Sequence, residues 1–312
     1  MDLLKIAENN TPKEPKNYSF FYKFLSLLSV VRGYNIAVIV LAQYLASIFI
    51  FAPDKSLKTI LLDLDLYFIV LATICVIASG YIINNFYDAD KDLINRPQKT
   101  KIDSIVTQKT KLTIYFILNF LGFGFGFLVS WKAAVFFAIY IFLIWFYSHK
   151  LRSYPLVKLF SAATLSLLPF FAIFVYYKNF STIIFTHASF LFFVLLIREL
   201  IKDLESIKGD IVLDYVTIPI KYGEYFTKML ITLITFFTLP PIYFLMKYPE
   251  IGYMRYYFYF SILLLLIFEI FLWRSKNKKD YLILHTLLKI LIIAGVFSLA
   301  LIDASVIIKR IM

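Results

Sequence analysis

The chain has 312 residues, of which 61% are hydrophobic and 17% charged, and its mean hydropathy is +0.79. Soluble domains are closer to half apolar, so this composition excludes an ordinary water-soluble globular protein. The net charge of +12 does not indicate a nucleic-acid partner, because the basic residues lie between long apolar stretches, as in membrane proteins.

Residues 1–20 form a polar segment that we expect to be a cytoplasmic tail. Its basic and acidic residues are mixed and do not lead directly into an apolar core, so the pattern is not that of a cleaved signal peptide. Residues 21–312 are predicted to form one transmembrane domain. The lone cysteine, Cys75, excludes a disulfide and predicts a small buried apolar side chain.

The apolar stretches that follow predict an all-α polytopic membrane protein, a bundle of nine helices around a central cavity. A helix needs roughly 20 residues to cross a hydrocarbon core of about 30 Å. The predicted spans are residues 25–50, 67–87, 112–131, 133–148, 156–177, 182–201, 225–246, 254–273 and 281–307. Spans three and four should form a tight hairpin. Prolines inside spans five and seven are tolerable where neighbouring helices satisfy the freed backbone groups.

The segments between spans are alternately rich and poor in lysine and arginine along the chain. These residues concentrate on the side that holds the N-terminal tail and the segments after spans two, four, six and eight. The positive-inside rule places this side in the cytoplasm, for a multi-pass protein of the cell (inner) membrane. Two loops on this side, 88–111 and 202–224, are longer than turns and also contain acids, which orientation alone does not require.

The first acidic cluster closes the second span. Asn84, Asp88 and Asp92 are spaced i, i+4, i+8 and would form one stripe if the helix continues, whereas Asp90 lies on the opposite face. Two carboxylates and an amide oxygen are hard ligands suited to Mg²⁺, and the repulsion between the acids favours a bound cation.

The second acidic cluster closes the sixth span. Glu199, Asp203, Ser206 and Asp210 recur at helical spacing, again on one face, and Lys202 lies beside them. Two oxygen-rich clusters on the same side of the membrane, with cations nearby, predict a magnesium–polyphosphate site. The candidate phosphate-binding cations are Arg96, Lys99, Lys150, Arg152 and Lys202. The abundant aromatic side chains could line a cavity that stabilises a carbocation.

These segments resemble the signatures of the UbiA-type membrane prenyltransferases, over about residues 20–305. The matching residues are Asn84 to Asp92 with Asn95-Arg96-Pro97, then Arg198-Glu199 to Gly223, Arg32 to Asn35, and Tyr147 to Leu156. The resemblance implies Mg²⁺-dependent transfer of an isoprenyl group from a prenyl diphosphate donor to a lipophilic acceptor, through an allylic cation. It also implies that one Mg²⁺ binds Asn84, Asp88 and Asp92, while a second binds Asp203 and Asp210. Arg96, Lys202 and Arg152 would hold diphosphate, and Asn35 would line the substrate cavity.

The sequence departs from the family pattern at two functional positions. Where the second signature usually reads D-x-x-D-x-x-x-D, Ser206 replaces the middle aspartate. Where many members have L-K-R-x-P-L-x-G-N, this chain has Leu151-Arg152-Ser153-Tyr154-Pro155-Leu156-Val157-Lys158-Leu159, so one basic residue has moved. The first departure predicts a weaker second metal, and the second leaves open which cation meets the diphosphate.

The motif form is most similar to the geranylgeranylglyceryl phosphate geranylgeranyltransferases, so the expected acceptor is that lipid or a similar polar lipid. One alternative is an aromatic acceptor of the 4-hydroxybenzoate, homogentisate or naphthoate type. Another, from a different class, is an ion-coupled transporter, since Glu269 and Lys289 are ionisable residues inside spans. The acids otherwise cluster at one membrane face rather than at the midplane, which favours the enzyme.

Overall fold

The computed structural model describes residues 19–303, apart from the side chain of Arg152, and consists of helices joined by turns, with no strand in this range. Within it, nine helical segments are long and apolar enough to cross a membrane, which confirms the predicted number. These are α3 (Gly33–Ala46, continued by a π-helical turn to Phe51), α5 (Leu64–Tyr87), α8 (Gln108–Val129), α9 (Trp131–His149), α10 (Pro155–Tyr177), α11 (Thr182–Val212), α13 with α14 (Glu224–Phe237, Leu239–Lys247), α15 (Arg255–Arg274) and α16 (Lys278–Ser298).

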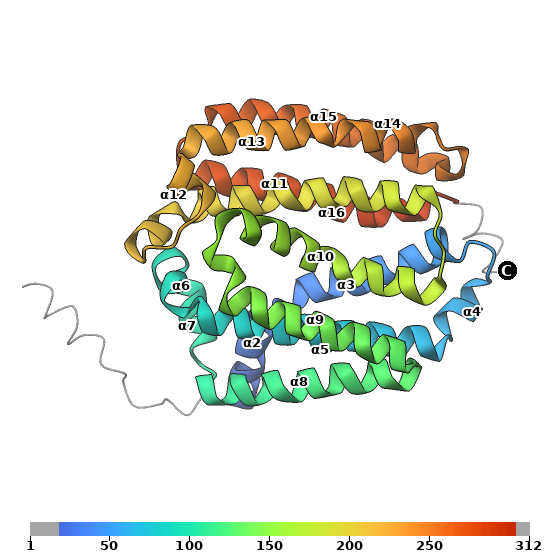
Figure 1. Ribbon diagram of the computed structural model, residues 1–312, viewed down its shortest axis with the longest axis horizontal. Helices are drawn as coiled ribbons and strands as arrows, with labels where there is room; N and C mark the ends of the chain where they lie inside the picture. Colours follow the sequence, from blue (N-terminus) through green and yellow to red (C-terminus); the bar gives the residue numbers. More distant parts are fainter. Residues whose placement is uncertain (1–18, 304–312) are drawn as a thin grey trace, which may run out of the picture.

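Six of these helices pack side by side in a closed ring. Neighbouring contacts run from α3 to α5, α9, α10, α11 and α16, and from α16 back to α3. Outside the ring, α8 covers α5 and α9, whereas α13, α14 and α15 cover α11 and α16 (Figure 1). The ring leaves a cavity at its centre, and the outer helices stabilise its walls.

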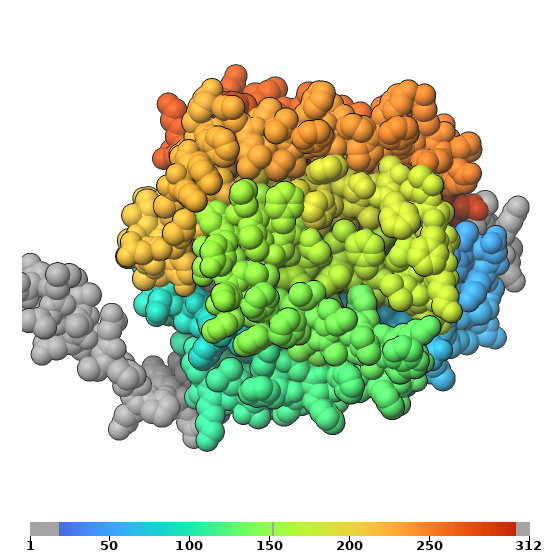
Figure 2. Space-filling view, in the orientation of Figure 1, coloured from blue at the N-terminus to red at the C-terminus, as the bar shows by residue number. Residues whose placement is uncertain are grey.

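The outer surface of the bundle is strongly apolar. Large side chains such as Phe120, Phe127 and Phe142 are exposed on α8 and α9, where a soluble protein would carry polar groups. Figure 2 shows one such face, covered by side chains of α8 to α11 and α13. Contact with lipid chains explains this surface.

The first predicted span is wrong at its start. Residues 25–50 do not form one helix, because Arg32 adopts the left-handed conformation (φ 50°) between α2 (Phe20–Val30) and α3. Polar residues of α2 instead bond to α7 (Pro97–Asp103), where Ser26 Oγ donates to the Ile102 carbonyl and Ser29 Oγ to Asp103. The membrane crossing therefore begins at Gly33, and Arg32 lies at the mouth of the cavity.

Both long acidic loops are more helical than predicted. Residues 202–212 continue α11, and only the following segment turns back, through α12 (Ile218–Tyr222). The other loop folds into α6 (Ala89–Asn95) and α7. All three short helices lie at the same end of the bundle, on the left in Figure 1, while α4 (Leu57–Leu61) lies at the opposite end.

Pro169 illustrates how the buried backbone is satisfied. A proline has no N–H to donate to the carbonyl four residues earlier, here that of Leu165. The hydroxyl of Tyr140 on α9 donates to this carbonyl instead, at 3.0 Å. Gln43 on α3 donates to the carbonyl of Pro169 itself, at 2.9 Å. Neighbouring helices thus make the proline tolerable, as predicted.

The last span also differs slightly from its predicted bounds. The helix α16 begins at Lys278, three residues early, behind a capping box formed by Asn277 and Asp280. A 3-10 turn continues it to Leu301, whereas residues 304–307 of the predicted span lie outside the described range. Cys75 is buried, as predicted.

Candidate active site

The ring encloses a cavity of about 460 Å³, and residues of α6 form part of its lining. Its deeper wall is apolar and aromatic, with Ile39, Ile77, Phe170, Leu191 and Phe258 among its side chains. Toward the α6 end it becomes highly charged. The described charged residues that line it are Arg32, Asp88, Lys91, Asp92, Arg96, Lys99, Lys158, Arg198, Glu199, Lys202, Asp203, Glu205 and Lys289. This division suits an amphipathic substrate with an anionic head and a long apolar tail.

The first cluster forms the predicted stripe although the helix has a slight break at Asp88. The Asp88 amide donates to the Asn84 carbonyl and the Asp92 amide to the Asp88 carbonyl, both at 2.8 Å, so helical spacing continues from α5 into α6. All three side chains line the cavity, whereas Asp90 is exposed elsewhere. The Asn84 amide oxygen accepts a hydrogen bond from buried Ser148 at 2.6 Å, which fixes its orientation.

Asp92 has the environment of a cation ligand. In the described part of the chain, no hydrogen bond or ion pair reaches its carboxylate, although it is partly buried. Burial, and then the neighbouring Asp88, raise the pKa of Asp92 above its ordinary value. No three His, Cys, Asp or Glu side chains converge on a metal site within residues 19–303. Two carboxylates and an amide nevertheless fit Mg²⁺, which commonly uses one or two carboxylates and takes its other ligands from phosphate and water.

The second cluster lies on one face of α11, but its members have different surroundings. Glu199, Asp203 and Ser206 line the cavity. Asp210 is completely buried, does not belong to the lining residues, and forms a salt bridge with Lys91. Lys158 on α10 donates to Asp203 at 2.5 Å.

The structure brings together most of the predicted substrate-binding residues. Asn35 lines the cavity and donates to the hydroxyl of Tyr81 at 3.1 Å. Arg96 and Lys202 also line it, paired at 3.0 Å with Glu205 and Glu199 respectively. Lys150, in contrast, is exposed after the end of α9 and does not reach the cavity.

The remaining predicted phosphate ligands are Lys99 and Arg152. Lys99 lines the cavity from α7 and pairs with Asp103 at 2.5 Å. Arg152 follows α9 in a 3-10 turn, but its side chain lies outside the described residues, so its predicted role stays a prediction.

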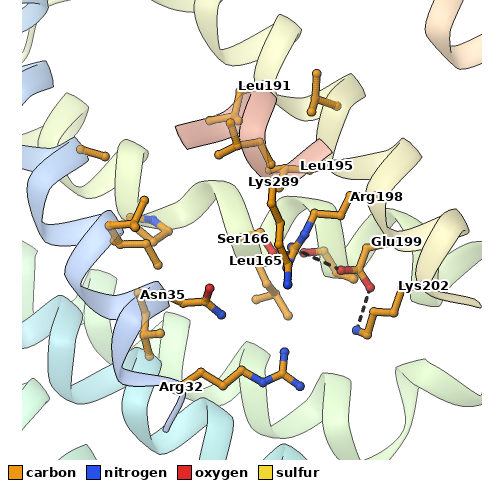
Figure 3. Close-up of a pocket in the computed structure, with 18 of the residues that line it drawn as sticks. Arg32, Asn35, Leu165, Ser166, Leu191, Leu195, Arg198, Glu199, Lys202 and Lys289 are labelled. Carbon is orange, nitrogen blue, oxygen red and sulfur yellow. Dashed lines mark hydrogen bonds and ion pairs between the residues drawn. The ribbon is translucent and has the colours of Figure 1, made fainter. Parts of the chain in front are cut away.

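Three cations in the cavity were not among the residues predicted to bind substrate. Arg32, Arg198 and Lys289 come from the start of α3, from α11 and from α16, and their side chains extend into the same cavity (Figure 3). The Nε of Arg198 is buried and has no hydrogen-bond partner among the described residues. Arg32 and Arg198 belong to the recognised signatures, so the sequence could have indicated their role. The sequence marked Lys289 only as an ionisable residue within a span.

Glu205 connects the two acidic regions through a third helix. It accepts from Arg96, which directly follows α6, and is within 3.0 Å of His285 on α16. This network holds α6, α11 and α16 together at the mouth of the cavity.

The two intramembrane charges do not form a pair of their own. Glu269 accepts from Thr232 on the neighbouring helix α13 at 2.8 Å, away from the cavity. Lys289 faces the cavity. Glu269 is therefore explained by helix packing and Lys289 by the site, so neither requires a transporter.

Comparisons with known proteins show the family of this chain. The model of the UbiA prenyltransferase family matches residues 40–290. The chain is 27% identical over 205 residues to digeranylgeranylglyceryl phosphate synthase of Methanobrevibacter smithii, a match that spans 63% of this chain and 69% of that relative.

Two solved structures share the fold. One is described as a digeranylgeranylglyceryl phosphate synthase in membranes, with a TM-score of 0.64 at 20% identity, covering 89% of this chain and 97% of that one. The other is a UbiA homologue from Archaeoglobus fulgidus bound to GPP and Mg²⁺, with a TM-score of 0.63 at 14% identity, covering 88% and 99%. With nine spanning segments in the described range, two acidic clusters at one end and a family match over most of its length, the chain belongs to the UbiA prenyltransferase family.

Proposed function

We propose that this prenyltransferase moves an isoprenyl group from a prenyl diphosphate to a polar lipid whose headgroup carries a phosphate, with geranylgeranylglyceryl phosphate as the best candidate acceptor. The observation that carries the proposal is the surplus of cations in the cavity. Eight basic and five acidic side chains line it in the described part of the chain, and two of the eight, Lys91 and Lys99, are neutralised by Asp210 and Asp103 outside the lining. Within the same range Arg32 and Lys289 form no salt bridge, and Arg198 approaches Glu199 only at 3.9 Å. A single diphosphate bound with a metal ion does not require so many, whereas two anionic substrates do.

The donor diphosphate would bind at the α6 end. Asn84, Asp88 and Asp92 would hold Mg²⁺, and Arg96 and Lys202 would contact the phosphates. When bound, Mg²⁺ neutralises the charge that develops on the departing diphosphate. The allylic C–O bond breaks with its electron pair leaving on the diphosphate. The acceptor hydroxyl then forms the new C–O bond and loses its proton.

The side chains around the reacting carbon would protect and stabilise the cation. Tyr81 is held by Asn35, and the guanidinium of Arg32 lies 5.2 Å from the centre of its ring. The apolar walls exclude water, which would otherwise capture the cation. Aromatic faces such as those of Tyr147 and Phe170 also line the cavity and favour positive charge nearby.

The acceptor phosphate would bind where the side chains of Arg32, Arg198 and Lys289 extend into the cavity. These three residues also line a second cavity of about 440 Å³ beside the first, next to His285 and Leu282. The relative from Methanobrevibacter smithii is named for a product that contains glyceryl phosphate, which supports the same acceptor class.

An acceptor panel tests this proposal. Protein in lipid nanodiscs would receive labelled geranylgeranyl diphosphate, Mg²⁺ and one of three acceptors: geranylgeranylglyceryl phosphate, the same lipid without phosphate, or 4-hydroxybenzoate. We expect the phosphorylated lipid to be preferred by about tenfold or more, since a charge-assisted contact contributes about 1.5–3 kcal/mol. Preference for 4-hydroxybenzoate would instead support an aromatic acceptor.

A variant pair connects this preference to the residues. Lys289→Met should raise the KM for the phosphorylated lipid and leave transfer to the dephosphorylated lipid nearly unchanged. Lys279→Met, at an exposed position on the same helix, is the control and should change neither. An equal effect of Lys289→Met on both acceptors would contradict the phosphate contact.

A further inference from the structure

The second acidic cluster does not offer a second divalent metal the ligands that it needs. Asp203 lines the cavity, and its carboxylate already has a cation, Lys158. The Lys158 Nζ lies 2.5 Å from Asp203 Oδ1, and the two side chains are only 12% and 7% exposed. Lys158 belongs to the first turn of α10, which packs directly against α11, so the pair joins two rigid elements.

Ser206 and Asp210 do not complete a metal site. The Ser206 hydroxyl donates to Asp210 Oδ2 at 2.8 Å, and it supplies no negative charge. Asp210 is completely buried beneath the cavity wall and forms a salt bridge with Lys91. A single carboxylate that is already paired with a lysine does not fit a second Mg²⁺.

Glu199 and Glu205 do not replace the missing ligands. Glu199 is paired with Lys202 at 3.0 Å, and Glu205 with Arg96 at 3.0 Å. Glu205 also contacts His285. Each of these carboxylates is therefore already balanced by a fixed cation.

We propose that Lys158 takes the place of the second metal, so that the diphosphate is held between one divalent ion on the Asn84–Asp88–Asp92 stripe and the ammonium group of Lys158. This inference rests on the proposed function. Relative to the family pattern, Ser206 removes one negative charge and Lys158 adds one positive charge. Together the two changes make the site more positive by two unit charges, which equals the charge of one Mg²⁺. Lys158 lines the same cavity as Asp88 and Asp92.

Metal stoichiometry tests the proposal without relying on turnover. The purified protein would be titrated with Mn²⁺ in the presence of a prenyl S-thiolodiphosphate, a donor analogue that resists ionisation. Bound Mn²⁺ would be counted by equilibrium dialysis, and its electron paramagnetic resonance spectrum would distinguish an isolated ion from a coupled pair. We expect one isolated Mn²⁺ per chain, lost in Asp92→Asn. A double variant, Lys158→Gly with Ser206→Asp, should bind two.

The outcomes separate this inference from the proposed function. Two Mn²⁺ ions in the wild-type protein, or no gain in the double variant, would overturn the inference and leave the proposed transferase in place. The absence of any bound Mn²⁺ in the wild type would overturn the metal site of the proposed function as well.

A kinetic comparison supplies a second readout. Lys158→Met should lower prenyl transfer by about tenfold or more at saturating Mg²⁺, because a fixed cation facing the leaving group is lost. Lys158→Arg should keep part of the rate, and Lys109→Met, an exposed lysine on α8, should keep all of it. Size-exclusion profiles would establish that each variant is folded. Full activity of folded Lys158→Met would overturn the inference.

Discussion

The hydroxyl of Tyr140 stands in for the backbone N–H that Pro169 lacks. Its hydrogen bond to the Leu165 carbonyl, at 3.0 Å, lies in a wall of the cavity. Tyr140→Phe leaves that carbonyl without its donor and should lower the free energy of unfolding by about 1–2 kcal/mol. In a Pro169→Ala background, the new N–H restores the hydrogen bond within the helix. Tyr140→Phe should then leave the free energy of unfolding almost unchanged. Denaturant titration in detergent micelles measures this cycle, and equal costs in both backgrounds would contradict it.

The pH at which Mg²⁺ binding is lost should be set by the pKa of Asp92. Its pKa is raised by burial and by Asp88, so it takes up a proton at a higher pH than an ordinary aspartate does. Mg²⁺ affinity should therefore be full above this raised pKa and fall as the pH drops through it. Lys99 lowers the pKa of Asp92, so Lys99→Met should raise the pH at which Mg²⁺ affinity begins to fall. Lys101→Met, exposed on the same helix, should not move it.

Sequence spacing alone could predict which acids share a face, because helical geometry fixes that relation within one element. It could not predict the partner of each acid. The Lys158–Asp203 and Arg96–Glu205 pairs join residues separated by 45 and 109 positions, and only helix packing brings them together. For the same reason, Lys150 was predicted to bind phosphate from its position in a basic loop, yet it is exposed outside the cavity.

Among the elements, the contact between α6 and α11 sets the distance between the two acidic clusters. A Cβ atom added to Gly209 on α11 would lie 2.3 Å from the side-chain nitrogen of Asn95, which is itself buried on α6. Gly209 lies inside α11, where its missing side chain admits α6.

Gly209→Ala should therefore separate the clusters. We expect a loss of prenyl transfer of about tenfold or more, since small displacements of positioned groups greatly reduce rates. Gly124→Ala on α8 is the matched control, because no atom lies within 4 Å of the Cβ position there. Assays at saturating donor and Mg²⁺ would compare the two. Equal activities would show that the close approach is not required.

The predicted spans reproduced the number of crossings because hydropathy depends on local composition. They did not reproduce the break at Arg32 or the extension of α11 to Val212. The break at Arg32 accompanies tertiary bonds from Ser26 and Ser29 to α7, which no apolar pattern records.

For the whole molecule, the distribution of lysine and arginine predicts that the end with both acidic clusters faces the cytoplasm. Single cysteines can test this orientation, because Cys75 is buried and should remain unlabelled. In intact cells, a membrane-impermeant maleimide should label Lys132→Cys at the start of α9. It should label Lys109→Cys, at the start of α8, only after the membrane is permeabilised. The reverse pattern would place the site on the other side.

The central claim is that the first acidic cluster carries out metal-dependent ionisation of a prenyl diphosphate. The most direct measurement is single-turnover release of diphosphate from labelled geranylgeranyl diphosphate, with the glyceryl phosphate lipid present, by wild-type, Asp88→Asn and Asp92→Asn protein in nanodiscs. We predict release and prenyl transfer that require Mg²⁺ in the wild type and fall by about a hundredfold or more in both folded variants. Full release by both variants, or wild-type release that needs neither Mg²⁺ nor acceptor, would contradict the account.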